Sequence, residues 1–178
     1  MAALISVDEL NEFTGNYSEV DFKTTLVEAA SLVVESYLRY SPLTEDRRYS
    51  LISWGTRDVL LPVPNASEIK SVIIDEETVA ESEYSLGQSG LYGVLEFTNR
   101  VARGAEIVAV YTAGWEAVDI PAAIKHACLR IAALMLEEAN GNIGVTGKTF
   151  ADMSKNFISY TNYNKYLAPI SQYRAGVL

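Results

Sequence analysis

A glycine-rich segment near the end of the chain resembles part of a nucleotide-binding loop. Residues 144–149 read Gly-Val-Thr-Gly-Lys-Thr, and Gly-Lys-Thr ends the phosphate-binding loop of nucleotide hydrolases. That loop needs a first glycine five positions before the second, but position 142 is Asn and Gly141 lies one residue too early. It also follows a buried strand and opens a helix, so that backbone N–H groups converge on the phosphate. Here the sequence predicts a helix before the segment and none after it, so we expect no nucleotide site.

Nucleophilic and metal chemistry have few residues to draw on, because the chain has one Cys and one His. Cys128 and His126 lie two positions apart on a predicted helix, so their side chains point in different directions. Cys128 falls on the apolar stripe of that helix and is interpreted as a core residue. A single imidazole excludes a histidine-cluster metal site. We therefore expect no catalytic, metal-binding or cofactor-binding residues.

A run of carboxylates, Asp75 to Glu77 followed by Glu81 and Glu83, could hold a divalent cation. It lacks the fixed ligand spacing and the glycine of a calcium-binding loop. We interpret the run as the solvated tip of a hairpin.

Aromatic residues suggest contact more than catalysis. Trp54 and Trp115 stand beside glycines, and packing explains both, because a base-stacking platform needs basic neighbours and none cluster there in the sequence. Four of the 11 tyrosines lie within residues 160–173. Tyr is favoured at interfaces because it combines apolar area with a polar rim. This segment is therefore a candidate docking surface.

The composition limits the classes of protein that remain. The 178 residues suit one domain, and 49% of them are hydrophobic. The 23 acids and 14 bases give a net charge of −9, which is a poor match to a phosphate backbone. One Cys allows no intramolecular disulfide. No basic leader or apolar run of about 20 residues appears, so we expect a soluble protein made in the cytoplasm, with no membrane contact.

Helical patterns occur at both ends of the chain. Ser6 to Glu9 form a capping box, which predicts a helix over about 6–14. Longer helices are predicted over about 18–40, ending before Pro42, and over 119–140, ending at Gly141. The apolar positions expected to form the core between these helices are Phe22, Leu26, Val33, Tyr37, Ile124, Cys128, Ile131 and Met135, and the family resemblance described below implies that the same helices form part of a ring interface between copies.

The middle and the tail of the chain read differently. Short β-branched and aromatic runs between 57 and 112 predict antiparallel hairpins with one wet face. Their expected bounds are 58–64, 69–74, 84–86, 92–97 and 107–112.

The C-terminal segment differs in charge from the rest of the chain. Residues 141–178 hold one acid and four bases, which leaves a net charge of −12 for residues 1–140. Tyrosines recur at helical spacing from Tyr160, interrupted by Pro169. Because backbone ordering costs roughly as much as burying this segment returns, we expect the tail to fray until it docks.

One stretch makes the order of these patterns specific. Residues 108–115, Val-Ala-Val-Tyr-Thr-Ala-Gly-Trp, precede Ile-Pro at 120–121 and an Ala- and Leu-rich helix. Two further segments, residues 60–64 and 69–75, lie before this stretch and complete the order of motifs. Over most of residues 3–140 the chain resembles the head–tail connector (adaptor, or head-completion) proteins of long-tailed bacteriophages.

The resemblance implies an α+β, mainly α fold. Two long antiparallel helices and shorter ones would form a helical bundle with a small antiparallel β-hairpin insertion and an extended C-terminal arm. The expected division is a connector core, 1–140, and a docking arm, 141–178.

The resemblance also implies a structural role in the virion neck. Twelve copies would form a ring beneath the portal protein, above a stopper or tail protein, and DNA would pass through the lumen without sequence-specific binding. The arm residues expected to contact the portal are Tyr160, Tyr163, Tyr166, Leu167, Ile170, Tyr173 and Arg174.

Other functions stay open from the sequence. A stopper or tail-end ring protein would share the small size and acidic charge. A soluble module that binds a protein through the β element would remain a monomer. A small hydrolase would depend on His126, the only imidazole of the chain.

Overall fold

A computed structural model describes residues 3–17, 22–139, 147–150, 153–156 and 163–176. The chain divides into two compact units. The helical unit comprises Met1–Tyr37 and Ile120–Gln172, and the β unit comprises Leu38–Asp119 and Tyr173–Leu178. The chain therefore passes from one unit to the other three times.

The first helix, α1 (Val7–Thr14), begins at the predicted capping box. The Ser6 hydroxyl accepts a hydrogen bond from the Glu9 N–H at 3.0 Å, and the Glu9 carboxylate accepts one from the Ser6 N–H at 2.7 Å. The helix ends at Gly15, whose φ of 67° lies in the left-handed region that glycine tolerates. Both predicted ends of this helix are confirmed.

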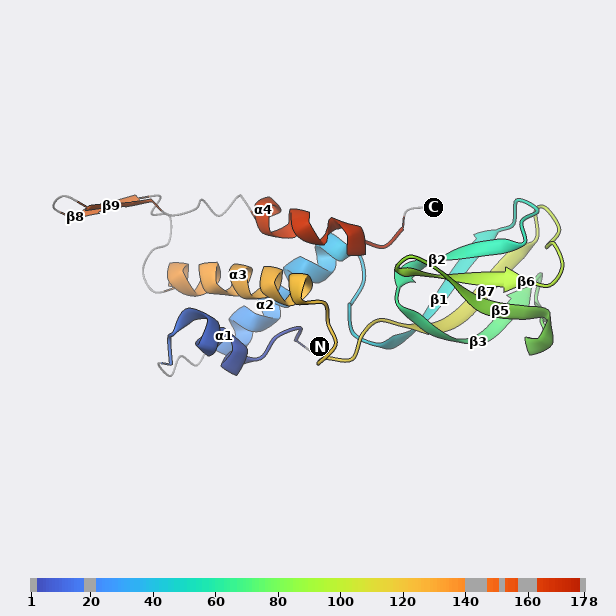
Figure 1. The fold of residues 1–178 in the computed structure, drawn as a ribbon, viewed down its shortest axis with the longest axis horizontal. Helices are drawn as coiled ribbons and strands as arrows, with labels where there is room; N and C mark the ends of the chain where they lie inside the picture. Colours follow the sequence, from blue (N-terminus) through green and yellow to red (C-terminus); the bar gives the residue numbers. More distant parts are fainter. Residues whose placement is uncertain (1–2, 18–21, 140–146, 151–152, 157–162, 177–178) are drawn as a thin grey trace. The chain divides into compact units, whose positions relative to one another are not determined.

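The longer helices are α2 (Lys23–Leu38) and α3 (Ala122–Glu137). Both lie within the predicted ranges 18–40 and 119–140. The helical unit also contains a hairpin of β8 (Gly147–Phe150) and β9 (Met153–Asn156), the short helix α4 (Asn164–Leu167) and the 3₁₀ helix η3 (Ala168–Tyr173). Figure 1 shows α1 and α4 on either side of α3.

Two antiparallel sheets form the β unit. The four-stranded sheet has the order β1-β7-β3-β4, and the three-stranded sheet has the order β2-β6-β5. The bounds are β1 Glu45–Ile52, β2 Asp58–Pro64, β3 Ala66–Ile74, β4 Glu77–Thr78, β5 Tyr84–Ser89, β6 Tyr92–Phe97 and β7 Glu106–Ala113, with the 3₁₀ turn η1 at Glu81–Glu83. Ile107, Ala109 and Tyr111 of β7 are buried, as are Leu95 and Phe97 of β6.

The expected mainly α bundle with a small hairpin insertion is wrong. The fold is a β-rich α+β fold, in which two antiparallel sheets form a compact unit of their own. All five predicted strands are present, as β2, β3, β5, β6 and β7. The strand β1 was not predicted, because Glu45 to Arg48 are all charged. Pairing along the whole length of β7 stabilises this charged strand at the edge of the sheet.

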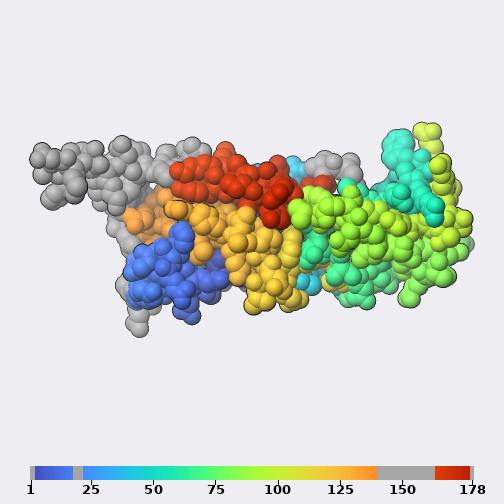
Figure 2. All heavy atoms as spheres, in the orientation of Figure 1, coloured from blue at the N-terminus to red at the C-terminus, as the bar shows by residue number. Residues whose placement is uncertain are grey.

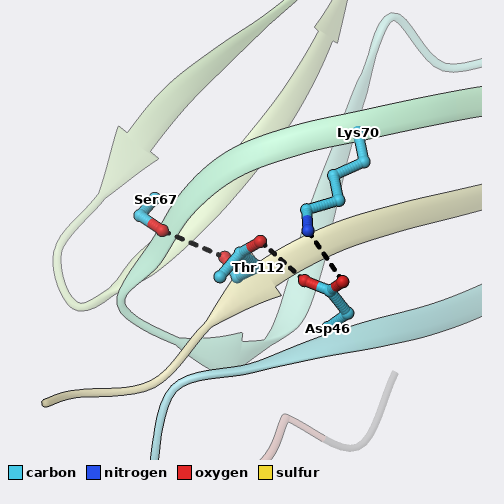
Figure 3. A network of polar contacts seen from close by, with 4 residues as sticks. All are labelled: Asp46, Ser67, Lys70 and Thr112. Carbon is cyan, nitrogen blue, oxygen red and sulfur yellow. Dashed lines mark hydrogen bonds and ion pairs between the residues drawn. The ribbon is translucent and has the colours of Figure 1, made fainter.

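The outer face of the four-stranded sheet carries a polar network (Figure 3). The Asp46 carboxylate on β1 accepts a hydrogen bond from the Thr112 hydroxyl on β7 at 2.9 Å and pairs with the Lys70 ammonium on β3 at 2.7 Å. Hydrogen bonding by Lys70 and then by Thr112 lowers the pKa of Asp46. This side of the sheet is the wet face that the alternating pattern predicted.

A backbone constraint explains the glycine in the Tyr-Thr-Ala-Gly-Trp stretch. Gly114 has a φ of 115°, and a side chain there would collide with the backbone carbonyls of Leu43 and Pro42. The Thr44 and Trp115 backbones pair on either side of this contact, with Thr44 N–H donating to the Trp115 carbonyl at 3.0 Å. Glycine is therefore required where the chain leaves β7.

Replacing Gly114 with Ala should lower the free energy of unfolding by about 3 kcal/mol or more, since the substitution adds both backbone strain and a collision. Gly90→Ala is the matched control. Gly90 also has a positive φ, 63°, but nothing lies within 4 Å of an added methyl group, so its cost should be about 1 kcal/mol. Urea unfolding of both variants measures the difference, and equal costs would contradict the close-approach argument.

Candidate functional site

The predicted docking arm packs against its own subunit. Leu167 is 6% exposed and Ile170 is fully buried, in contrast to the expectation that the tail frays. Tyr163 and Tyr166 are half-buried, and Tyr160 lies outside the described residues. The tyrosine-rich segment, in which the sequence predicts a helix interrupted by Pro169, forms the short helix α4 followed by the 3₁₀ helix η3, and Pro169 lies within η3.

Tyrosine hydroxyls hold the end of the arm against the β unit. The Tyr40 hydroxyl donates to the Tyr173 carbonyl at 2.8 Å, and the Tyr92 hydroxyl donates to the Arg174 carbonyl at 2.7 Å. The Trp115 ring meets the Tyr173 ring edge-on at 5.9 Å between centroids.

Two backbone hydrogen bonds continue this attachment. Ala175 N–H donates to the Leu38 carbonyl at 2.9 Å, and Gly176 N–H donates to the Pro62 carbonyl of β2 at 2.8 Å. Successive carbonyls and N–H groups of residues 173–176 thus have partners within the β unit. These hydrogen bonds offset part of the entropy that ordering the tail costs.

The exposed side chains of the arm are not the apolar ones that were predicted to dock. Lys165, Ala168, Pro169, Ser171 and Gln172 are exposed. The Lys165 ammonium lies 4.9 Å from the centroid of the Tyr166 ring. A partner that meets the folded arm would contact this basic and aromatic surface, while Leu167 and Ile170 anchor it from below.

The predicted helix positions divide into core and surface. Ile124, Cys128 and Ile131 of α3 are buried, as expected for its apolar stripe, whereas Met135 is half-buried. On α2 the buried stripe is displaced by one residue from the prediction. It consists of Lys23, Val27, Ala30, Ser31, Val34 and Leu38.

The predicted α2 positions instead form a second apolar face, which we call the α2 outer face. It consists of Phe22 just before the helix, Leu26, Val33 and Tyr37, with Leu32 beside it. Phe22 is 38% exposed and Leu32 is 47% exposed, and the other three are half-buried. An apolar helix face of this extent is typical of contact with another protein.

One buried cation was missed. A lysine is expected on the solvent-facing side of an amphipathic helix, but the side chain of Lys23 is buried. The Lys23 ammonium donates to the Asn11 side-chain oxygen at 2.6 Å and to the Asn16 carbonyl at 2.8 Å. These acceptors lie at the C-terminal end of α1, where the helix dipole favours a cation. No local pattern in the sequence predicts this pairing.

The residues considered for chemistry do not come together in the described structure. The His126 ring contacts Phe13 edge-on at 5.9 Å between centroids, and its Nε2 lies 3.4 Å from Arg130 Nε. Cys128 is buried, with the Ser31 hydroxyl 3.7 Å from its sulfur. Burial raises the pKa of the Cys128 thiol to about 12, which disfavours the thiolate that a nucleophile needs.

The described residues include no group of three or more Cys, His, Asp or Glu residues placed to bind a metal ion. No helix among them is long and apolar enough to cross a membrane. Residues 144–146 of the Gly-Lys-Thr segment lie outside the described part of the chain.

The fold of the chain has a match among solved structures. The chain is similar to a solved structure described as "Neck of empty GTA particle computed with C6 symmetry", with a TM-score of 0.62 and 13% sequence identity. The alignment covers 98% of this chain and 91% of the other. No curated protein sequence matches.

The family is established by the sequence. The family model of the head completion protein matches residues 3–167, and the chain belongs to this family. The resemblance to head–tail connector proteins is thereby confirmed, and with it a structural role in joining head and tail at the virion neck.

Substituting Ile170 by Ala should cost about 2–5 kcal/mol of unfolding free energy, because a fully buried side chain of the arm is removed from the core. Lys165→Ala, an exposed position on the same arm, should change stability by less than about 0.5 kcal/mol. Denaturant unfolding of both variants measures this. Equal stability of the two would show that the arm is not anchored.

Cys128 should resist alkylation in the folded protein at pH 8 and react at least about a hundredfold faster in urea. Its pKa rises from an ordinary 9.0 to about 12 on folding. The neutral thiol therefore contributes its full stability below pH 9, and this contribution falls as the pH rises from 9 towards 12. Thermal unfolding of Cys128→Ala and wild type between pH 8 and 11 measures the pH effect, and the variant should lose less stability over that range.

Proposed function

We propose that this protein is a subunit of a ring, twelve copies strong, that sits beneath the portal protein and extends the DNA channel towards the next neck protein. The ring has no catalytic role. The observation that carries the proposal is membership of the head completion family over residues 3–167. The similar fold from a particle neck computed with C6 symmetry supports a ring whose copy number is a multiple of six.

The α2 outer face is the proposed contact between neighbouring copies. Its apolar side chains from Phe22 to Tyr37 follow one side of the helix and keep exposed area in the single chain. Interfaces between identical subunits are richer in apolar area than ordinary surface. Covering this face with the next copy would remove that area from water.

Portal docking is assigned to the outward surface of the arm. Lys165 and the half-buried tyrosines Tyr163 and Tyr166 offer aromatic area beside a positive charge. Tyr173 and Arg174 keep part of their side chains exposed beside them in sequence. Leu167 and Ile170 serve the contact indirectly, because they hold the arm against the subunit.

The net charge of −9 suits a channel wall that lets DNA pass. Phosphate-binding proteins gain affinity by releasing counterions when Lys and Arg neutralise phosphates. An acidic lumen repels the duplex instead, so DNA would move through without being gripped.

The test uses DNA-filled heads that carry the portal and lack neck proteins. The wild-type chain should sediment with them, and electron microscopy should show twelve copies per head. The double variant Lys165→Glu, Tyr166→Ala should bind at least about tenfold more weakly, since it reverses a charge and removes an aromatic anchor on the outward surface. Arg39→Glu, a charge-matched change at an exposed position outside the arm, is the control.

Point variants are preferred to truncation, because deleting the arm would remove Ile170 from the core. Failure of the wild-type chain to bind portal-bearing heads would contradict the proposed function. Undiminished binding of the double variant would contradict the role given to the arm.

A further inference from the structure

The helical unit carries an aromatic cluster where α1 meets α3. The His126 ring meets the Phe13 ring edge-on at 5.9 Å between centroids, and the Arg130 guanidinium lies 5.3 Å from the centroid of the same ring. Phe13 is 37% exposed, and His126 and Arg130 are exposed. We call these three residues the Phe13 cluster. Each side chain limits the freedom of the others, which lowers the entropy that binding a partner would cost.

A hollow opens beside the Phe13 cluster. Its volume is about 240 Å³, and apolar and polar residues of α1 and α3 and of the turn after α1 line it, namely Phe13, Ala133 and Leu136 with Thr14, Asn16 and Glu137. An apolar cavity of about 150 Å³ is large enough to take up a benzene ring. The hollow therefore has room for one leucine or phenylalanine side chain.

The α2 outer face and the Phe13 cluster lie on opposite sides of the helical unit. The Ser31 hydroxyl of α2 lies 3.7 Å from the Cys128 sulfur of α3, so the two helices face each other through their buried stripes. Each residue turns an α-helix by about 100°, and positions two apart therefore point in nearly opposite directions. His126 and Arg130 thus lie on the side of α3 away from Cys128. In the same way, Val33 lies on the side of α2 away from Ser31.

The figures agree with this arrangement of the helical unit. Figure 1 draws α2 behind α3, and Figure 2, in the same orientation, shows α3 at the surface between α1 and the segment of α4 and η3. A subunit with complementary patches on opposite sides can make head-to-tail contacts. Such contacts close into a ring when the rotation between copies allows it.

The two patches carry opposite charge. Within α2, Lys23 is buried and Glu28 is exposed, one helical turn before Leu32. The Phe13 cluster instead presents Arg130, which forms no ion pair within the described part of the chain. Arginine and aromatic residues are enriched among those that dominate the binding energy of interfaces. The Glu28 carboxylate would complement the Arg130 guanidinium.

We propose that the α2 outer face of each copy docks onto the Phe13 cluster of the next copy in the ring. Glu28 pairs with Arg130, and Leu32, one turn further along α2, enters the hollow. The spacing is consistent, because Ala133 in the lining of the hollow lies about one turn beyond Arg130 on α3. This inference rests on the ring proposed above and names the surface that receives the α2 outer face.

A second copy suits the Phe13 cluster better than DNA or another neck protein. One arginine neutralises one phosphate, which gives little affinity for DNA to a chain of net charge −9. Each copy carries both halves of the contact, an apolar and acidic face on α2 and a cationic cluster with a hollow on α1 and α3. In a closed ring every such face is covered, so its apolar area is removed from water.

The experiment measures self-association of the full chain by sedimentation velocity and mass photometry at low and high salt. Leu32→Ala should weaken association about tenfold, because the hollow loses the side chain that fills it. Glu28→Arg and Arg130→Glu should each weaken it about tenfold. The double variant with both charges exchanged should return to within about threefold of wild type.

The β unit offers a matched control pair. Trp54 is 76% exposed, and the Arg103 guanidinium lies 5.5 Å from the centroid of its ring, a contact of the same kind as that between Phe13 and Arg130. Trp54→Ala and Arg103→Glu should associate as wild type does. Circular dichroism and thermal unfolding should match wild type for every variant, because all the substituted side chains are exposed.

The outcomes separate this contact from the ring itself. If wild-type rings form and the α2 and α3 variants form them equally well, the docking contact is overturned while the ring stands. If the charge-exchanged double variant stays as weak as the single variants, or if the control pair weakens association as much, the proposed surfaces do not meet and the contact is also overturned. If wild-type copies associate on portal-bearing heads alone, copies counted per head replace the measurement in solution. If they associate in neither setting, the ring and this contact fall together.

Discussion

Burial of α3 against segments from the opposite end of the sequence holds the helical unit together. Ser31 marks the meeting point, since its hydroxyl accepts from Leu4 N–H at 3.0 Å, donates to the Val27 carbonyl at 2.8 Å and lies 3.7 Å from Cys128 of α3. The whole β unit except its last residues is inserted between α2 and α3. Folding of the β unit brings the end of α2 and the start of α3 close together, which lowers the entropy lost when α3 packs in the helical unit.

The sequence predicts two kinds of element correctly: helices whose ends are marked by capping residues or proline, and strands in which buried and exposed side chains alternate. The capping box of α1, the alternation of β6 and the proline near the start of α3 all lie in the printed sequence. The strand β1 has no such pattern in its sequence. Arg47 and Arg48 lie on opposite faces of the sheet although both are charged, and only the pairing with β7 identifies this segment as a strand. The strands that the sequence does predict, taken without β1, resemble a hairpin insertion in a helical protein. The sequence therefore underestimates the share of β structure in the fold.

The interaction surfaces were harder to derive than the core. An apolar stripe does not say which of two adjacent faces of α2 is buried, and the presence of Lys23 on the buried face is decided by acceptors on α1. Likewise, Leu167 and Ile170 suggested a docking surface because apolar residues at helical spacing suit either an interface or a core. Pairing of Trp54 with Arg103 depends on two loops that only the folded sheets bring together.

The three chain crossings between the units have a mechanical consequence. A pull between the units would be shared by covalent segments at 37–38, 119–120 and 172–173, whereas an ordinary pair of domains has a single linker. Peptide hydrolysis at any one crossing would leave two covalent connections. Such triple attachment suits a structural component whose two units must stay joined under load.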